Sequence, residues 1–139
     1  MFLTSITDPS PTIRVARVLL VEDSAVYVER ISEVLHDVVE VDLVKVVDTE
    51  NAAVASIFEW DIDVIILDLH LREGSGFGVL RALATMARRP RVIVLTNHDL
   101  EEYQTAAVAL GAAHFLDKAR DAHRLPAILR ELVRSGPRH

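Results

Sequence analysis

The chain has 139 residues, half of them hydrophobic, which suits one domain with a sizeable core. A net charge of −6 argues against nucleic-acid binding through a basic surface, and the lack of cysteine excludes disulfides and a thiolate nucleophile. No apolar run approaches the roughly 20 residues that span a bilayer, and the first residues do not resemble a signal peptide. We therefore expect a cytoplasmic protein that binds neither nucleic acid nor membrane.

The two ends of the chain differ in composition from its middle. Residues 1–14 contain Thr, Ser and two prolines and are predicted to be a flexible lead-in. Residues 15–135 are predicted to form one domain, followed by a tail at residues 136–139. Little more than one helix follows Asp121, so a stand-alone domain without an output domain is expected.

Apolar runs alternate with helical periodicities along the whole domain. Helices are recognised by apolar residues at 3.6-residue spacing and by capping residues at their starts. The predicted elements are, in order, strand 15–21, a helix capped by Ser24, strand 39–47, a short helix starting near Thr49, strand 64–67, helix 77–87 with Phe77, Leu80 and Ala84 inward, strand 91–95, a helix capped by Asp99, strand 113–116 and a helix capped by Asp121.

Strands and helices that alternate through short connections predict a parallel sheet covered on both faces. The expected fold is therefore α/β, a single doubly wound, flavodoxin-like sheet of five strands in the order 2-1-3-4-5. Ligands bind beyond the carboxyl ends of such strands, where the strand order reverses. Here that point lies between the first strand, which ends at Glu22 and Asp23, and the third, which ends at Asp68.

The ends of four predicted strands supply a set of polar side chains that suits phosphoryl chemistry. The set consists of Glu22, Asp23, Asp68, Thr96 and Lys118. Like charges repel by about 4 kcal/mol per pair at roughly 4 Å and an effective dielectric near 20, so three carboxylates need a cation. Oxygen ligands favour Mg²⁺. A carboxylate, a divalent cation, a lysine and a hydroxyl together indicate phosphoryl transfer, with the carboxylate attacking phosphorus.

Several motifs agree with this interpretation in their order and spacing. They are VLLVEDS at 18–24, IILDL at 65–69 followed by Gly76, VLT at 94–96 and GAAHFLDK at 111–118. Together they resemble a response-regulator receiver domain of the single-domain, chemotaxis-receiver type. The resemblance covers nearly all of residues 15–135.

The resemblance implies a metal site and a phospho-acceptor. Asp68 would accept the phosphoryl group. Asp23 and Asp68 would bind Mg²⁺ directly, Glu22 would bind it through a water molecule, and the backbone carbonyl of His70 would complete the protein ligands. The donor would be a sensor histidine kinase or a histidine phosphotransfer protein.

The resemblance also implies a switch. Thr96 and Lys118 would hydrogen-bond the phosphoryl oxygens, and Thr96 and Phe115 would move on phosphorylation; packing in the core is the other role open to Phe115. The changed surface would bind an unidentified downstream protein, and a homodimer is compatible with the apolar helix faces. Chemistry would be limited to the domain's own phosphotransfer and autodephosphorylation, so it is not expected to be an enzyme.

Residues beside the expected site depart from the family pattern. Ala119 follows Lys118, where the family usually has a proline after a cis peptide, so this bond is trans or the site stores strain. Asn97 is bulkier than usual and would narrow access to the site. His70 and His98 either flank the phosphoryl pocket and tune its lifetime or are solvated loop residues.

Other functions remain open from the sequence. A relay intermediate or a phosphate sink fits as well as an adaptor. An aspartate-nucleophile phosphatase would commonly carry a second aspartate at the position of His70. A flavodoxin is disfavoured because Glu22 and Asp23 place negative charge where the FMN phosphate would bind.

Overall fold

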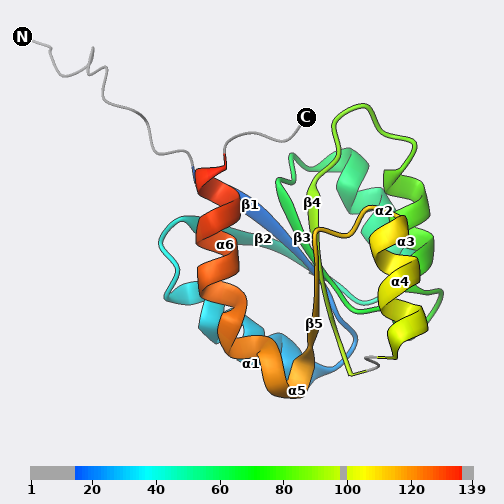
Figure 1. The fold of residues 1–139 in the computed structure, drawn as a ribbon. Coiled ribbons are helices and arrows are strands. Elements are labelled where there is room, and N and C mark those ends of the chain that lie inside the picture. The colour runs from blue at the N-terminus through cyan, green and yellow to red at the C-terminus, as the bar shows by residue number, and fades with distance from the viewer. Residues whose placement is uncertain (1–14, 98–99, 136–139) are drawn as a thin grey trace, which may run out of the picture.

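A computed structural model describes residues 15–97 and 100–135 (Figure 1). The predicted lead-in and tail, together with His98 and Asp99, lie outside these ranges. The elements are β1 (Ala16–Val21), α1 (Ala25–His36), β2 (Val41–Val47), α2 (Glu50–Glu59), β3 (Val64–Leu67), α3 (Gly76–Leu83), β4 (Arg91–Thr96), α4 (Glu101–Ala109), β5 (His114–Asp117), α5 (Lys118–Asp121), the 3-10 helix η2 (Ala122–Arg124) and α6 (Leu125–Arg134). Within the described ranges, no helix has both the length and the apolar character needed to cross a bilayer.

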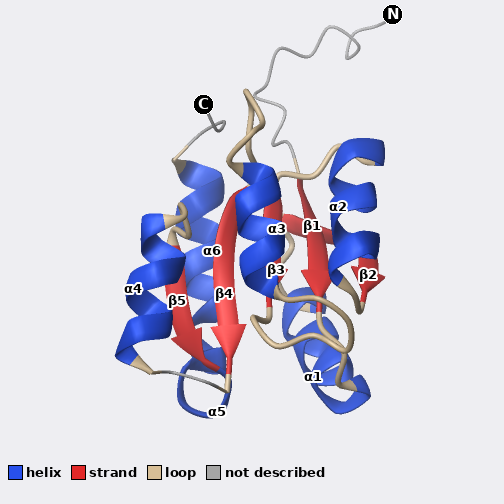
Figure 2. Cartoon of the chain, turned by 90° about the vertical axis from the view of Figure 1, so that its right-hand side faces the viewer, coloured by secondary structure: helices blue, strands red, loops and turns tan. Residues whose placement is uncertain are grey.

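The strands form one parallel sheet of five in the order β2-β1-β3-β4-β5, which confirms the predicted topology. Helices α1, α5 and α6 lie on one face and α2, α3 and α4 on the other (Figures 1 and 2). In the register of the sheet, Val21 of β1 pairs with Leu67 of β3, and Leu67 pairs with Val94 of β4. The carboxyl ends of these three strands therefore lie at one edge.

β3 is buried on both of its faces. Val64 and Ile66 belong to the core between the sheet and helices α1 and α6, whereas Ile65 and Leu67 belong to the core beneath α2, α3 and α4. A strand covered on both sides needs apolar residues at every position, which explains why its sequence shows no alternation. The residue after Leu67 is thereby held in place by packing from two layers.

Helix α3 is shorter than the predicted helix at 77–87. It begins at Gly76 because the Ser75 hydroxyl accepts a hydrogen bond from the Gly78 N–H (3.3 Å). It ends at Leu83, where the Thr85 hydroxyl donates to the Ala82 carbonyl (2.7 Å) and competes with further helical bonds. The expectation that Ala84 faces inward was wrong, since this residue lies beyond the helix and is exposed.

The predicted cap of the last helix at Asp121 was wrong, because α6 follows Arg124 and the Asp121 side chain makes no capping hydrogen bond at the start of η2. The side-chain cap in this region belongs to the short helix α5, which follows β5 directly. Asp117 caps α5, because its Oδ1 accepts from the N–H groups of Ala119 (2.8 Å) and Arg120 (3.0 Å). The Asp121 carboxylate accepts from the Asp117 N–H (2.9 Å).

No peptide bond in the described ranges is cis, so the bond after Lys118 is trans.

Gly76 packs against the backbone that carries Asp68. A Cβ at this position would lie 2.5 Å from the Asp68 carbonyl oxygen and 2.8 Å from the Leu69 Cα. Because backbone atoms cannot move aside cheaply, Gly76→Ala is expected to lower the free energy of unfolding by about 2–3 kcal/mol, measured by urea denaturation.

Gly111→Ala is the comparison variant, with a φ of +104° but only the Arg89 side chain near its Cβ, at 3.5 Å. Backbone strain alone should cost it about 1 kcal/mol. A Gly76→Ala protein that unfolds at the wild-type urea concentration would contradict the close contact with the Asp68 backbone.

Candidate functional site

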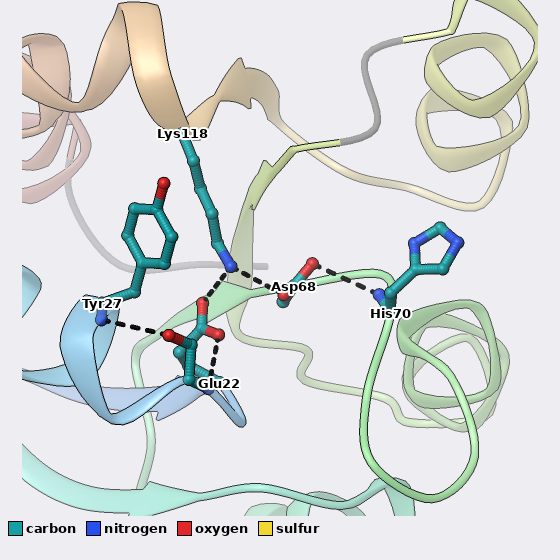
Figure 3. Close-up of polar contacts among 6 residues, drawn as sticks. Glu22, Tyr27, Asp68, His70 and Lys118 are labelled. Atoms are coloured by element: carbon teal, nitrogen blue, oxygen red, sulfur yellow. Dashed lines mark hydrogen bonds and ion pairs between the residues drawn. The ribbon is translucent and has the colours of Figure 1, made fainter.

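Asp68 follows β3 directly, at the carboxyl edge of the sheet. Its N–H donates to the Val21 carbonyl at the end of β1 (3.0 Å), so the strand pairing continues up to this residue. The side chain is buried, with Oδ1 accepting from the His70 N–H (3.2 Å) and Oδ2 from Lys118 Nζ (2.8 Å; Figure 3). The carboxylate is thus oriented by one group from the following loop and one from α5.

Glu22 and Asp23 follow β1, the strand next to β3. The Glu22 N–H donates to the Val47 carbonyl at the end of β2 (2.9 Å), and its Oε2 accepts from the Ser24 N–H (2.9 Å). Glu22 is buried and Asp23 is exposed. One carboxylate oxygen from each of Glu22, Asp23 and Asp68 lies within 4.8 Å of the others. The structure therefore brings the three predicted carboxylates together.

Lys118 joins the two buried carboxylates. Its Nζ lies 2.6 Å from Glu22 Oε1 and 2.8 Å from Asp68 Oδ2 (Figure 3). None of the three side chains is more than 6% exposed, so salt screens these pairs far less than it screens surface pairs. Removing one partner from such a group leaves an uncompensated buried charge, which is strongly destabilising.

Burial and pairing act in opposite directions on the pKa values of the site. Burial raises the pKa of the Glu22 carboxyl above its ordinary 4.5, and the hydrogen bonds from Lys118 and Ser24 oppose this only in part. Burial alone would lower the pKa of Lys118, but hydrogen bonds and charges from Asp68 and Glu22 outweigh it and raise the pKa above 10.5. Lys118 therefore remains charged at neutral pH.

The donor set fits a hard divalent cation. Three carboxylates face one ammonium group, which leaves an excess of negative charge at the edge of the sheet. Mg²⁺ takes oxygen ligands, retains several waters and needs only one or two carboxylates from the protein. Because Asp23 is exposed, the cluster is open to solvent on that side.

The other predicted residues lie at the ends of β4 and β5. Thr96 ends β4, is fully buried and pairs in register with Asp117 of β5. Phe115 of β5 is half-buried and packs against the core beneath α2, α3 and α4. Asn97 is exposed. These positions agree with the predicted edge, and the roles of the three residues stay predictions.

His70 is exposed but is not simply a solvated loop residue. Its ring centroid lies 5.6 Å from that of Tyr103 on α4, and the Tyr103 ring lies 6.0 Å from that of Phe77 on α3. The loop after Asp68 therefore contacts α4 through an aromatic side chain. The predicted influence of His70 on the lifetime of a phosphoryl group stays a prediction, and His98 lies outside the described residues.

Tyr27 was not among the residues predicted from the sequence. It lies in the first turn of α1, and its ring centroid is 4.3 Å from Lys118 Nζ (Figure 3). The feature of the sequence that could have pointed to Tyr27 is its position, about one helical turn after the acidic pair that follows β1.

The family is decided by a match over most of the chain. Residues 18–130 match the response regulator receiver domain. The chain belongs to this receiver family. The domain is 37% identical over 120 residues to protein-glutamate methylesterase/protein-glutamine glutaminase 5 of Myxococcus xanthus, covering 84% of the chain and 34% of that protein. It is 25% identical to the transcriptional regulatory protein DegU of Brevibacillus brevis, covering 86% and 51%. The chain thus spans about a third to a half of the length of these relatives.

Solved receiver domains share the fold. The signal receiver domain of a putative Luxo repressor protein from Vibrio parahaemolyticus has a TM-score of 0.79 and 30% identity, covering 87% of this chain and 92% of that one. The response regulator domain of CheB from Thermotoga maritima has a TM-score of 0.75 at 24% identity, covering 88% and 96%. At this low identity, the likeness to the CheB domain supports the fold alone.

Lys118→Met is expected to lower the free energy of unfolding by about 3–5 kcal/mol at neutral pH, because it leaves two buried carboxylates without their cation. The folded-state pKa of Lys118 is raised, so its contribution is fully present below the ordinary value of 10.5 and is lost as the pH rises through the higher folded-state value. Urea denaturation in metal-free buffer, repeated across this pH range, measures both effects.

The control is Arg120→Met, which removes an exposed cation two residues further along α5. It should change the free energy of unfolding by less than about 0.5 kcal/mol. Equal losses in the two variants would contradict the role of Lys118 as the cation of the buried group.

Proposed function

We propose that this receiver domain accepts a phosphoryl group on Asp68 from a phosphohistidine of a sensor histidine kinase or a histidine phosphotransfer protein. The observation that carries the proposal is the Asp68 carboxylate, held at the sheet edge 2.8 Å from the Lys118 ammonium in a chain of the receiver family. A carboxylate oxygen of Asp68 would bond to phosphorus as the bond from phosphorus to the histidine nitrogen breaks. The released imidazole then takes up a proton.

The acidic cluster supports Mg²⁺ as the cofactor of this transfer. Asp23 and Asp68 would bind it directly and Glu22 through a water molecule. As the likeness to the receiver family implies, the backbone carbonyl of His70 would complete the protein ligands. When bound, Mg²⁺ supplies positive charge against the phosphoryl oxygens. Lys118 supplies a second positive charge and is already placed beside the acceptor oxygen.

Phosphorylation would act on the rest of the domain through charge. The acyl phosphate carries roughly two negative charges where the Asp68 carboxylate carried one, and it presents new acceptor oxygens. Lys118 would bind one of these oxygens, and Thr96 would donate its hydroxyl to another from the end of β4. Movement of Thr96 and Phe115 would shift the population of conformations at the surface around α4 and β5, which a downstream protein would recognise. We expect no turnover of an external substrate by this domain.

Incubation with acetyl phosphate and Mg²⁺ is expected to add one phosphoryl group to the wild-type protein, measured as intact mass. Asp68→Asn should show no gain, because the attacking carboxylate is absent. Asp37→Asn is the matched control, since it changes an exposed aspartate at the far end of α1 and should be phosphorylated normally. No gain in the wild type, or an equal gain in Asp68→Asn, would overturn the proposal.

A further inference from the structure

The Lys118 ammonium has one uncharged neighbour beside its two carboxylate partners, the ring of Tyr27. Tyr27 lies in the first turn of α1, is half-buried and packs against the core beneath α1 and α6. Lys118 Nζ lies 4.3 Å from its ring centroid, and the guanidinium carbon of Arg30 lies 5.7 Å from the same centroid. A cation within about 6 Å of an aromatic ring face is attracted by the ring quadrupole, and more strongly when it is desolvated.

The two carboxylate partners of Lys118 differ from the ring in one respect. Glu22 and Asp68 both belong to the acidic cluster, so a bound cation or a new phosphoryl group would compete for the same oxygens. The ring of Tyr27 carries no charge and belongs to no part of that cluster. Its contact with Lys118 can therefore persist while the ion pairs rearrange.

We propose that Tyr27 is a positioning residue that holds the Lys118 ammonium beside Asp68 through the face of its ring while the carboxylates change partners. This inference rests on the proposed phosphorylation of Asp68. Without the ring, the ammonium would follow its carboxylate partners and occupy the phosphoryl-binding position for less of the time. Lys118 would remain charged and the sheet would remain folded.

The contact can be tested by NMR without any phosphorylation. The lysine signals are few, because the chain contains only two lysines, Lys45 and Lys118. Protein labelled at lysine should give two sets of ε-methylene NMR signals, with those of Lys118 shifted upfield by the Tyr27 ring. Tyr27→Leu should abolish this shift and Tyr27→Phe should retain it. Lys45, which lies 5.2 Å from the ring centroid of Trp60, is the internal reference and should not change. An unchanged Lys118 signal in Tyr27→Leu would overturn the inference.

The effect on chemistry is tested by the rate of Asp68 phosphorylation with acetyl phosphate and Mg²⁺. Tyr27→Leu should lower this rate by about 5- to 30-fold, the range expected for loss of a desolvated cation–π contact. Tyr27→Phe should recover most of the rate, because it keeps the ring and loses only the hydroxyl. Val34→Ala removes packing from the same helix against the same core and should leave the rate unchanged.

The two proposals fail in different ways. A wild-type protein that is not phosphorylated overturns the proposed function, and the NMR signals then still decide whether the ring binds the ammonium. A Tyr27→Leu protein that is folded by circular dichroism and is phosphorylated at the wild-type rate overturns the positioning role, while the proposed function stands.

Discussion

The carboxyl edge of this sheet depends on the Lys118 ammonium between Glu22 and Asp68. The parallel topology brings the ends of β1 and β3 together, and both strands are followed by a buried carboxylate. Two such groups repel each other and lose hydration when they are buried. Lys118, the first residue of α5, offsets both the repulsion and the loss of hydration. It reaches the two carboxylates although β4 lies between β3 and β5 in the sheet. The same cation that makes the edge stable is therefore the one that a phosphoryl group would need.

The site has more negative charge than stability alone would favour. Burial raises the pKa of the Glu22 carboxyl, because a carboxylate that loses its hydration is less stable in the ionised form. Replacing a buried group of ion pairs with well-packed apolar residues of similar size is often neutral or stabilising, so stability alone does not call for these charges. Excess charge at the open edge of a parallel sheet is instead what a cation-dependent site requires, and local conflict of this kind is typical of functional positions.

Much of the fold was predictable, because buried parallel strands leave a strong sequence signal. The unbroken apolar run of β3 and the polar residues that follow each strand predict both the topology and the convergence of the carboxylates. The helix ends were less predictable, since side-chain to backbone hydrogen bonds decide them. Asp117 and Asp121 are equally good capping residues by type, and only the structure shows that Asp117 caps α5.

The contact between Tyr27 and Lys118 could not be predicted for a different reason. An aromatic residue in the first turn of a helix can face the core or the sheet edge, and the packing of α1 against the sheet decides which. Tyr27 does both, because its ring packs against the core and also contacts an ammonium from α5. Sequence spacing carries no information about this contact, because α1 and α5 lie far apart in the chain.

The most direct measurement is a Mg²⁺ titration of the metal-free domain, followed by the backbone amide signals of Asp23, Asp68 and His70. If the acidic edge binds a divalent cation, these signals shift saturably in the wild type. Asp23→Asn, which removes an exposed carboxylate and leaves the buried ion pairs intact, then shows weaker binding. Shifts that do not saturate, or an equal affinity in Asp23→Asn, would contradict a cation site formed by these strand ends.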